Sequence, residues 1–181
     1  MEYDCTLQEL LALDFGSIFS PAYKGLRVLL LEDVLRKLGR TVIMNIHMKM
    51  WDPDIGAPVY EEIAALIRKH QCQHHVYVTS TSLAHLEAFH AVAPEIALCT
   101  CFNGRKGDPY ARIEKAAAIG LKKIQISHPK KEVIDFVHEK GMVCNVCFAD
   151  SAEAGAELLE MSADTLMTNN IIDVIPLLSK V

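Results

Sequence analysis

Residues 42–49 read Val42-Ile43-Met44-Asn45-Ile46-His47-Met48-Lys49, and their side chains alternate with a period of two. Read as a strand, the stretch has one face of Val42, Met44, Ile46 and Met48 and another of Ile43, Asn45, His47 and Lys49. A strand in an all-parallel sheet is normally apolar on both faces, because helices cover both. Three polar side chains on one face therefore predict either an edge strand with a solvent-facing side or a strand that carries part of a ligand site. In β/α proteins ligands bind at the C-terminal ends of the strands, the end that His47 and Lys49 approach.

The composition is that of a globular domain. The chain has 181 residues and a mass of 20.1 kDa, with 51% hydrophobic residues and a mean hydropathy of +0.18. Its net charge is −5 and it has no clustered basic segment, so we expect no nucleic-acid binding. No apolar run approaches the length of a membrane span, and the first residues lack the apolar core of a secretory signal. We therefore expect a cytoplasmic protein with a single domain over residues 1–181.

The six cysteines do not predict a metal site. Cys99 and Cys101, and likewise Cys144 and Cys147, fall in β-branched runs that are typical of strands. Residues three apart on a strand point to opposite faces, so Cys144 and Cys147 would not share a zinc ion. In the absence of a secretory signal we expect buried thiols rather than disulfides.

Strand-like and helix-like stretches alternate from residue 41 onward. The predicted strands cover 42–48, 75–80, 96–101, 122–127, 142–148 and 164–168. The predicted helices cover 59–70, 82–92, 109–119, 130–140, 151–161 and 171–180. Strands that alternate with helices of this length indicate parallel βαβ units with right-handed crossovers.

A helical lead-in, residues 1–40, precedes these units. Thr6 and Glu9 have the spacing of a capping box, which predicts a short helix to about Ala12. A loop follows over 14–24, and a second helix is expected over 31–38, with Gly39 as a left-handed stop.

Two architectures accommodate six βα units, an open doubly wound sheet and a β/α barrel. A complete barrel needs eight units and typically about 250 residues. No glycine-rich dinucleotide fingerprint or phosphate-binding loop follows any predicted strand, so the usual support for a nucleotide-binding doubly wound fold is missing. The pattern alone leaves an open sheet and an incomplete barrel as alternatives.

Polar residues follow most of the predicted strands and would share one rim. They are His47, Lys49, Thr79, Ser80, Thr81, Cys101, Asn103, Gln125, Ser127, His128, Asn145, Asp150, Thr168, Asn169 and Asn170. Lys49 is a cation suited to phosphate, and His47 is suited to metal binding or proton transfer. Asp150 is the single acid clearly near this rim, so a hard cation would be held weakly. The loop from Asp52 to Pro58, flanked by Trp51 and Tyr60, is either a cover for the rim or a plain connection.

The remaining histidines give no cluster. His85, His90 and His138 fall in predicted helices, where we expect exposed positions rather than chemical roles.

These residues together resemble the glycerophosphodiester phosphodiesterase family. The resemblance is carried by Thr6-Leu-Gln-Glu-Leu10, Leu31-Glu-Asp-Val-Leu35, Asn45-Ile-His-Met-Lys49, Val76-Tyr-Val-Thr-Ser80 and Ala163-Asp-Thr-Leu-Met-Thr-Asn169. Each motif is weak alone, but their order and spacing cover nearly the whole chain. The resemblance is to the C-terminal part of that family.

The resemblance implies an α/β fold, an incomplete (β/α) TIM-type barrel of about six parallel βα units after a short helical segment. It implies metal-dependent hydrolysis of glycerophosphodiesters to glycerol phosphate and an alcohol, a role in lipid metabolism. His47 stands where the family usually has a glutamate, so the resemblance implies that His47 is a ligand for Mg²⁺ or Ca²⁺. Lys49 would act catalytically on the phosphate side, and substrate would be bound by Asn45, Gln125, Asn145 and Asp150.

The sequence also departs from the family. The histidine-arginine-glycine, glutamate-asparagine-threonine, glutamate-x-aspartate and histidine-aspartate motifs of the family's first strands do not occur in it. The general acid, the general base and most metal ligands would belong to those segments. The resemblance therefore implies that hydrolysis by this chain alone is impaired.

Three hypotheses follow. The first is a truncated phosphodiesterase-like domain that acts on a small phosphodiester, with the absent strands either supplied by a complementing chain or lost from the gene model. The second is a non-catalytic remnant that binds a phosphate ligand or a partner, with homo-oligomerisation through open sheet edges as one form. The third is an unrelated doubly wound binding domain.

Overall fold

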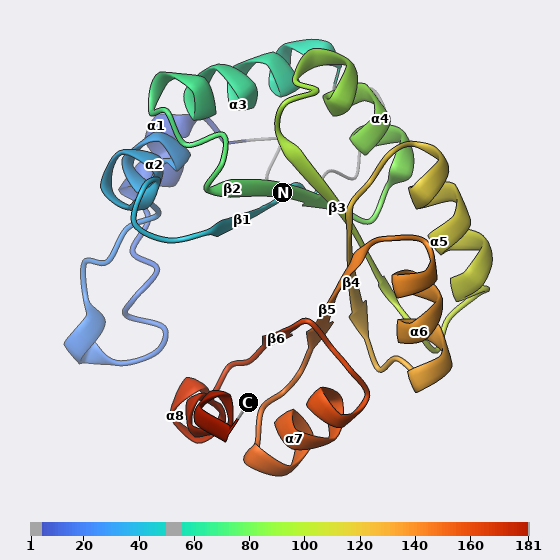
Figure 1. Ribbon diagram of the computed structural model, residues 1–181. Helices are drawn as coiled ribbons and strands as arrows, with labels where there is room; N and C mark the ends of the chain where they lie inside the picture. Colours follow the sequence, from blue (N-terminus) through green and yellow to red (C-terminus); the bar gives the residue numbers. More distant parts are fainter. Residues whose placement is uncertain (1–4, 50–55, 181) are drawn as a thin grey trace.

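The computed structural model describes residues 5–49 and 56–180, and in these ranges strands and helices alternate as the sequence predicts (Figure 1). The strands are β1 (Met44–His47), β2 (Val76–Ser80), β3 (Ala97–Asn103), β4 (Lys123–Ser127), β5 (Val143–Cys147) and β6 (Thr165–Met167). The α-helices are α1 (Leu7–Ala12), α2 (Leu31–Leu38), α3 (Ala57–Lys69), α4 (Leu83–Val92), α5 (Pro109–Ala118), α6 (Lys131–Glu139), α7 (Ala152–Glu160) and α8 (Ile171–Val174). Two 3₁₀-helices, η2 (Pro21–Tyr23) and η3 (Ile175–Lys180), complete the set.

The six strands form one parallel sheet in the order β1-β2-β3-β4-β5-β6. Each strand pairs with its predecessor in the chain, and the sheet curls while the helices stay on its outer side (Figure 1). This arrangement is an incomplete TIM-type barrel, as predicted. The alternative of a doubly wound sheet is wrong for this chain. In a doubly wound sheet the strand order reverses at a switch point and helices cover both faces, whereas here the order runs from β1 to β6 without reversal.

The hydrophobic core lies between the outer side of the sheet and the helices. Val78, Ile126 and Val146 project outward from their strands and are fully buried. They join helix residues such as Ile67 and Leu86 in one cluster. Since strand side chains alternate, the residues between them point into the hollow of the curl, where few helices cover them.

Local signals fix most helix ends. Thr6 and Glu9 form the predicted capping box, Ser82 caps α4 through the amide of His85, and Ser151 caps α7. Gly120 and Gly141 follow α5 and α6 with positive φ angles of 83° and 69°, which glycine adopts without strain.

Gly39 does not stop α2 in the left-handed conformation, so that prediction was wrong. Its φ and ψ angles are −58° and −15°, and its amide donates to the carbonyl of Leu35. The absence of a side chain matters here for packing, because a Cβ would lie 2.4 Å from the Leu35 oxygen and 3.2 Å from Cys72. The last helix also differs from its prediction over 171–180, because α8 gives way to the 3₁₀-helix η3 after Val174.

His85 is buried at 8% exposure, which corrects the expectation of an exposed helix position. The hydroxyl of Tyr60 lies 2.5 Å from its Nδ1 atom. Tyr60 comes from α3 and also packs edge-on against Phe89 of α4. The imidazole therefore joins two neighbouring helices.

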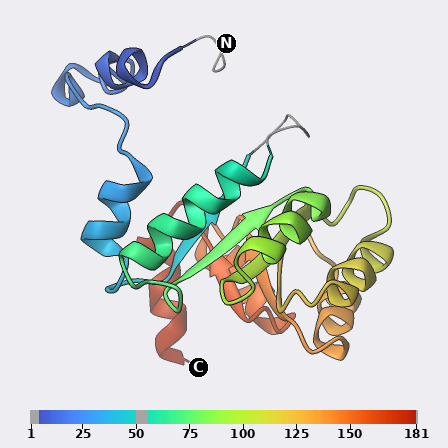
Figure 2. The same cartoon turned by 90° about the horizontal axis from the view of Figure 1, so that it is seen from above.

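The lead-in projects from the barrel (Figure 2), and α1 buries none of its residues. The loop after α1 is organised by the carboxylate of Asp14, which accepts hydrogen bonds from the amides of Gly16, Ser17 and Gly25. Large apolar side chains are exposed along this segment: Leu7, Leu13, Phe15, Ile18, Phe19, Tyr23, Leu26, Val28 and Leu29. Other residues in the described ranges leave much of the surface of these side chains exposed.

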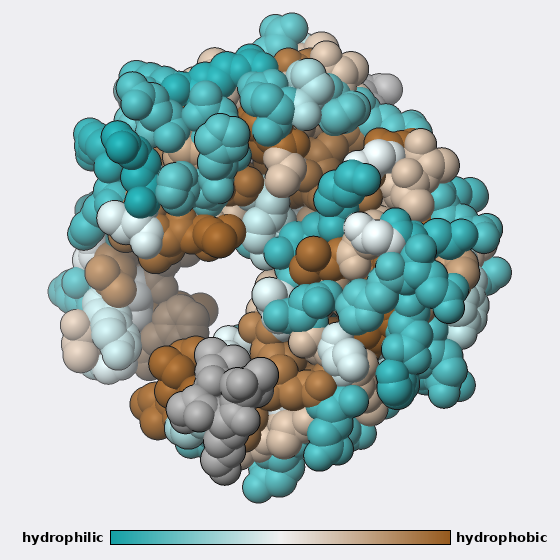
Figure 3. Space-filling view, viewed as in Figure 1, coloured by the Kyte–Doolittle hydropathy of each residue, from teal (hydrophilic) through white to brown (hydrophobic). Residues whose placement is uncertain are grey.

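The sheet has two open edges, since β1 and β6 each pair with one strand only in the described parts of the chain. Ile43 beside β1 and Ile172 on α8 are 74% and 79% exposed. The space-filling view shows an opening through the molecule, and hydrophobic surface borders part of it (Figure 3).

Two further sequence expectations concern the loop after β1 and membrane association. Residues 50–55, which carry most of the loop between Trp51 and Tyr60, lie outside the described residues. Within the described ranges, no helix is both long enough and apolar enough to cross a bilayer.

Candidate functional site

The inner surface of the curled sheet is polar, in contrast to its outer surface. The inward-facing register holds the polar or thiol side chains of Asn45, His47, Tyr77, Thr79, Cys99, Cys101, Asn103, Lys123, Gln125, Ser127, Asn145, Cys147 and Thr165, with the apolar Ala97, Val143 and Met167 at its margins. Hydrogen bonds between strands that are not neighbours show that these residues share one concave face. These hydrogen bonds place the candidate site inside the curled sheet, along the C-terminal halves of the strands and at their C-terminal ends.

Asn45 and Gln125 meet across the hollow. Nδ2 of Asn45 on β1 donates to Oε1 of Gln125 on β4 at 3.0 Å. Gln125 is buried at 7% exposure, and Oδ1 of Asn45 is buried without a hydrogen-bond partner. Two of the predicted substrate-binding residues are thus in direct contact, and one of them retains an unused acceptor.

Asn145, a third predicted residue, lies in an adjacent network. Its Nδ2 donates to the hydroxyl of Tyr77 at 3.3 Å, and its Oδ1 accepts from the hydroxyl of Thr165. The ammonium of Lys123 lies 4.6 Å from the centre of the Tyr77 ring. Burial raises the pKa of Tyr77, so its phenol stays protonated at neutral pH and the positive charge of Lys123 faces a neutral ring.

His47 and Lys49 stand at the C-terminal end of β1. Nε2 of His47 lies 3.5 Å from the thiol sulfur of Cys101 on β3. Burial, and then the nearby charge of Lys49, lower the pKa of His47, so its imidazole is neutral at pH 7. Burial also raises the pKa of Cys101, so the thiol beside it is neutral as well. Lys49 is exposed, and none of the ion pairs found among the described residues involves it.

Asp150 is not brought to this cluster. It is exposed in the loop between β5 and α7, where its carboxylate accepts from the backbone and side-chain amides of Asn169 at 2.7 and 3.0 Å. The hydroxyl of Thr168 is 3.4 Å away. These contacts depress the pKa of Asp150, the backbone amide of Asn169 having the largest effect. Here Asp150 ties the end of β6 to the loop after β5.

The donors on the concave face do not by themselves fit a divalent cation. Within the described ranges, no three histidine, cysteine, aspartate or glutamate side chains come together as metal ligands would. The nearest donor to His47 is the neutral thiol of Cys101, whereas Mg²⁺ and Ca²⁺ prefer several oxygen ligands. No chemical step through a metal follows from these residues.

Sequence reasoning missed Tyr77, Lys123 and Thr165, and it did not separate Ser80 from the inward-facing residues of the rim. Lys123 and Gln125 alternate with Ile124 and Ile126 in the same way as Asn45 and His47 alternate with their apolar neighbours, so the signal was present. Ser80 follows the outward register of Val78, and its hydroxyl accepts from the amide of Ser82.

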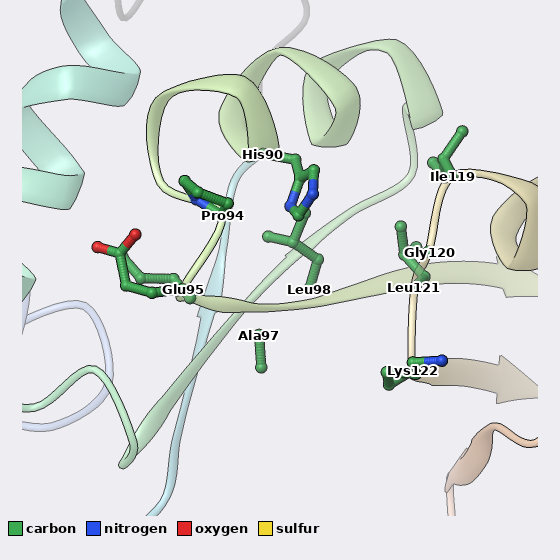
Figure 4. Close-up of a pocket in the computed structure, with 10 residues that line it drawn as sticks. His90, Pro94, Glu95, Ala97, Leu98, Ile119, Gly120, Leu121 and Lys122 are labelled. Carbon is green, nitrogen blue, oxygen red and sulfur yellow. The ribbon is translucent and has the colours of Figure 1, made fainter.

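A cavity of about 180 Å³ lies at the opposite end of the sheet, between the end of α4, the start of β3 and the loop before β4 (Figure 4). Its walls are mainly apolar and include Pro94, Leu98, Ile119 and Leu121. None of the predicted site residues lines it, and it is far from the C-terminal strand ends where β/α proteins bind ligands.

Known proteins share both the sequence pattern and the fold. YhdW of Bacillus subtilis (strain 168), named as a glycerophosphodiester phosphodiesterase, is 24% identical over 168 residues, which are 92% of this chain and 68% of that protein. A Galdieria sulphuraria structure of the same designation superimposes with a TM-score of 0.84 at 22% identity, over 97% of this chain and 71% of that one. An Oleispira antarctica phosphodiesterase in complex with the product sn-glycerol-3-phosphate gives a TM-score of 0.77 at 17% identity, over 98% and 72%.

The sequence model of the glycerophosphoryl diester phosphodiesterase family matches residues 3–173, from the lead-in to α8. That range holds all the strands of the curled sheet and all the polar side chains on its inner face. The chain therefore belongs to the glycerophosphoryl diester phosphodiesterase family.

Proposed function

We propose that this domain binds a glycerophosphodiester at the C-terminal end of its concave face and takes part in its hydrolysis to glycerol phosphate and an alcohol. The observation that carries the proposal is the position of Asn45, His47 and Lys49. Asn45 and His47 project from β1 toward the hollow of the sheet, where they contact Gln125 and Cys101, and Lys49, two residues past the end of β1, is an exposed cation without an ion pair among the described residues.

The proposed roles follow from charge and hydrogen bonding. Lys49 acts on the phosphate, where one charge-assisted contact stabilises binding by about 1.5–3 kcal/mol. Asn45, Gln125 and Asn145 hold hydroxyl or phosphate oxygens, and their mutual bonds keep them in place before the ligand arrives. Asp150 acts on substrate only through the loop that it fixes. His47 is the proposed ligand for Mg²⁺ or Ca²⁺, with the further ligands supplied from outside the described residues.

Hydrolysis also needs a general acid and a general base. The described part of the concave face has no pair of carboxylates or histidines that faces one ligand position. We therefore propose hydrolysis only in combination with segments that supply these groups, and binding without turnover is the alternative for the residues described. Cytoplasmic location, a role in lipid metabolism and a single domain over 1–181 stay predictions.

The test compares binding and turnover in the same preparations. Calorimetry with glycerol 3-phosphate should give a dissociation constant that Lys49→Ala weakens about tenfold to a hundredfold, corresponding to the loss of one charged contact. Lys122→Ala, which removes an exposed lysine just before β4, should leave it unchanged. Release of glycerol phosphate from a glycerophosphodiester, with Mg²⁺ or Ca²⁺ added, measures hydrolysis.

The outcome of these assays separates the possibilities. Turnover by the chain alone that His47→Ala abolishes would show that hydrolysis needs no complementing segment and would contradict that part of the proposal. Binding that depends on Lys49 without turnover by the chain alone agrees with both the proposal and the non-catalytic alternative, and turnover that appears only when a complementing chain is added favours the proposal. No binding of glycerol phosphate by a folded chain would contradict the proposal.

We also propose that the open edges of the sheet pair with another polypeptide, a second copy or a complementing chain. Unpaired strand edges and the exposed side chains of Ile43 and Ile172 support this. Light scattering should show an assembly that Ile43→Lys with Ile172→Lys disrupts. Val59→Lys, on the outer face of α3 at 37% exposure, should leave it intact. A monomer that stays free of aggregation would contradict homo-oligomerisation.

A further inference from the structure

A polar cavity, separate from the apolar one described above, lies between the loop that follows β3 and the loop that follows β4. Its volume is about 480 Å³, and it is lined by Gly104, Arg105, Gly107, His128, Pro129 and Lys130. All its ionisable lining groups are basic. We call it the β3–β4 rim cavity.

The cations of this cavity have no ion-pair partners among the described residues. Several basic side chains of the helices are paired, as in Arg68 with Glu95 and Lys131 with Asp135. No such pair involves Arg105 or Lys130 in the described ranges. In a chain of net charge −5, two unneutralised cations in one cavity form a local positive field that attracts anions.

The two loops are held in fixed positions. The amide of Gly104 donates to the carbonyl of Ser127 at 2.8 Å, and a Cβ at Gly104 would lie 3.0 Å from the carbonyl oxygen of His128. The amide of Arg105 donates to Oδ1 of Asn103 at 2.9 Å. The ring of His128 stacks on Phe148 with centres 5.5 Å apart. A site whose walls are set in advance loses less entropy when it binds a ligand.

A neighbouring cavity between α4 and α5 shows why this one is preferred. That cavity, of about 410 Å³, also has basic residues, among them Arg112. However, the guanidinium of Arg112 already donates to Thr81 and Thr100. The carboxylate of Asp108 also lines the neighbouring cavity. The β3–β4 rim cavity has neither an internal acceptor for its cations nor an acid.

The cavity opens at the same end of the sheet as Lys49, since Asn103 and Ser127 form the last registered pair between β3 and β4. We infer that the β3–β4 rim cavity binds a phosphate group and that, resting on the proposed function, the substrate is a glycerophosphodiester whose alcohol carries a second phosphate. The arginine fork matches phosphate oxygens, and Lys130 adds a second positive charge. The same two cations repel a trimethylammonium group, so choline diesters are disfavoured.

The first test uses inorganic phosphate and backbone amide signals in nuclear magnetic resonance spectra. The signals of Gly104, Gly107 and His128 should shift with a dissociation constant of about 1 mM or tighter. Arg105→Glu with Lys130→Glu should weaken this binding at least about tenfold, because both attractive charges become repulsive. Lys37→Glu with Lys122→Glu changes the net charge equally at two exposed lysines without ion pairs in the described ranges and should leave it unchanged.

Lys49→Ala separates this site from the one proposed above. The cavity signals should respond to phosphate in Lys49→Ala as they do in the original chain, so failure of the concave-face site would leave this binding in place. Signals that stay still, or that shift equally after the double charge reversal, would overturn the phosphate site and show only nonspecific ion association.

The second test concerns the substrate class. The chain should bind a glycerophosphodiester with a phosphorylated alcohol at least about tenfold more tightly than glycerophosphocholine, and the double charge reversal should remove this preference. Equal affinities in the original chain would overturn the assignment of the substrate while leaving the result with inorganic phosphate intact.

Discussion

The side-chain amide of Asn45 donates a 3.0 Å hydrogen bond to Gln125, a residue 80 positions later in the chain. Two strands, β2 and β3, lie between these residues in the sheet. Tyr77 and Asn145 repeat the relationship from β2 to β5. Such bonds span the hollow rather than run along the sheet, so they hold the curl of six strands that do not close on themselves in the described chain.

The first prediction is that Gln125→Met destabilises the fold by about 1–3 kcal/mol. The substitution preserves size but removes the acceptor of the Asn45 amide, whose Oδ1 is already unsatisfied. The free energy of unfolding, measured by urea denaturation, gives the effect. A double-mutant cycle with Asn45→Leu should show coupling, because Asn45→Leu removes the Nδ2 donor that Gln125→Met leaves without an acceptor. Additive effects would mean that the bond does not hold the curl.

A second prediction concerns the contact between Tyr60 and His85, which joins α3 and α4. Tyr60→Phe keeps the ring against Phe89 but leaves the buried imidazole without its partner, and it should lower stability by about 1–2 kcal/mol. Tyr110 provides the matched control, because its ring packs on Phe136 but its side chain is 42% exposed. Thermal unfolding of Tyr60→Phe and Tyr110→Phe measures the difference, and equal shifts would contradict a structural role for the bond.

The third prediction is a pH dependence of stability from Asp150. The amides of Asn169 favour the charged carboxylate and depress the pKa of Asp150 in the folded chain. The resulting stabilisation is present above the pKa of the unfolded chain, about 4, and is lost as pH falls through the lower folded value. Asp150→Asn should therefore be less stable than the original chain at pH 7, with a difference that shrinks below pH 4.

Asp33→Asn is the control for this experiment. Asp33 pairs with Arg36 on the surface of α2, and such exposed pairs contribute little to stability. A difference for Asp150→Asn that stays constant between neutral and acidic pH would show that its charge does not stabilise the loop.

The strands and the polar inner face could be predicted because both depend on local alternation. The alternation in residues 42–49 predicts one apolar face and one polar face. The helices between the strands, predicted from the repeated βα spacing, cover the apolar face. His85 could not be placed in this way. Helix α4 buries His85 together with the apolar Leu86 and Phe89. A histidine next to apolar positions does not by itself indicate burial, and its hydrogen-bond partner Tyr60 is distant in sequence.

Asp150 and Gly39 show the same limit. Proximity in sequence to the end of β5 predicted a place for Asp150 at the rim, whereas its hydrogen bonds to Asn169, which follows β6, were not predicted. Gly39 is needed because a side chain at this position would lie too close to Cys72, and no local sequence motif predicts that contact. Contacts of this kind depend on how elements pack and are visible only in the folded chain.

The last prediction concerns the thiols, which crowd the inner and outer surfaces of the sheet. Burial raises the pKa of both Cys99 and Cys144 to about 12, with the negative charge of Asp164 adding to the effect at Cys144. Only the thiolate reacts with disulfide reagents, and at pH 8 a thiol of that pKa is ionised in about one molecule in ten thousand. Burial raises the pKa of Cys72 as well. Cys5, in contrast, is exposed.

Ellman's reagent at pH 8 should therefore titrate one thiol rapidly in the folded chain and all six after denaturation. Cys5→Ser should remove the rapid phase, while Cys147, which is half-buried, should react slowly. Two or more rapid thiols in Cys5→Ser would contradict the tight packing of β3 and β5. They would indicate that the sheet opens at its inner face faster than the reagent reacts, a property that the bond between Asn45 and Gln125 should prevent.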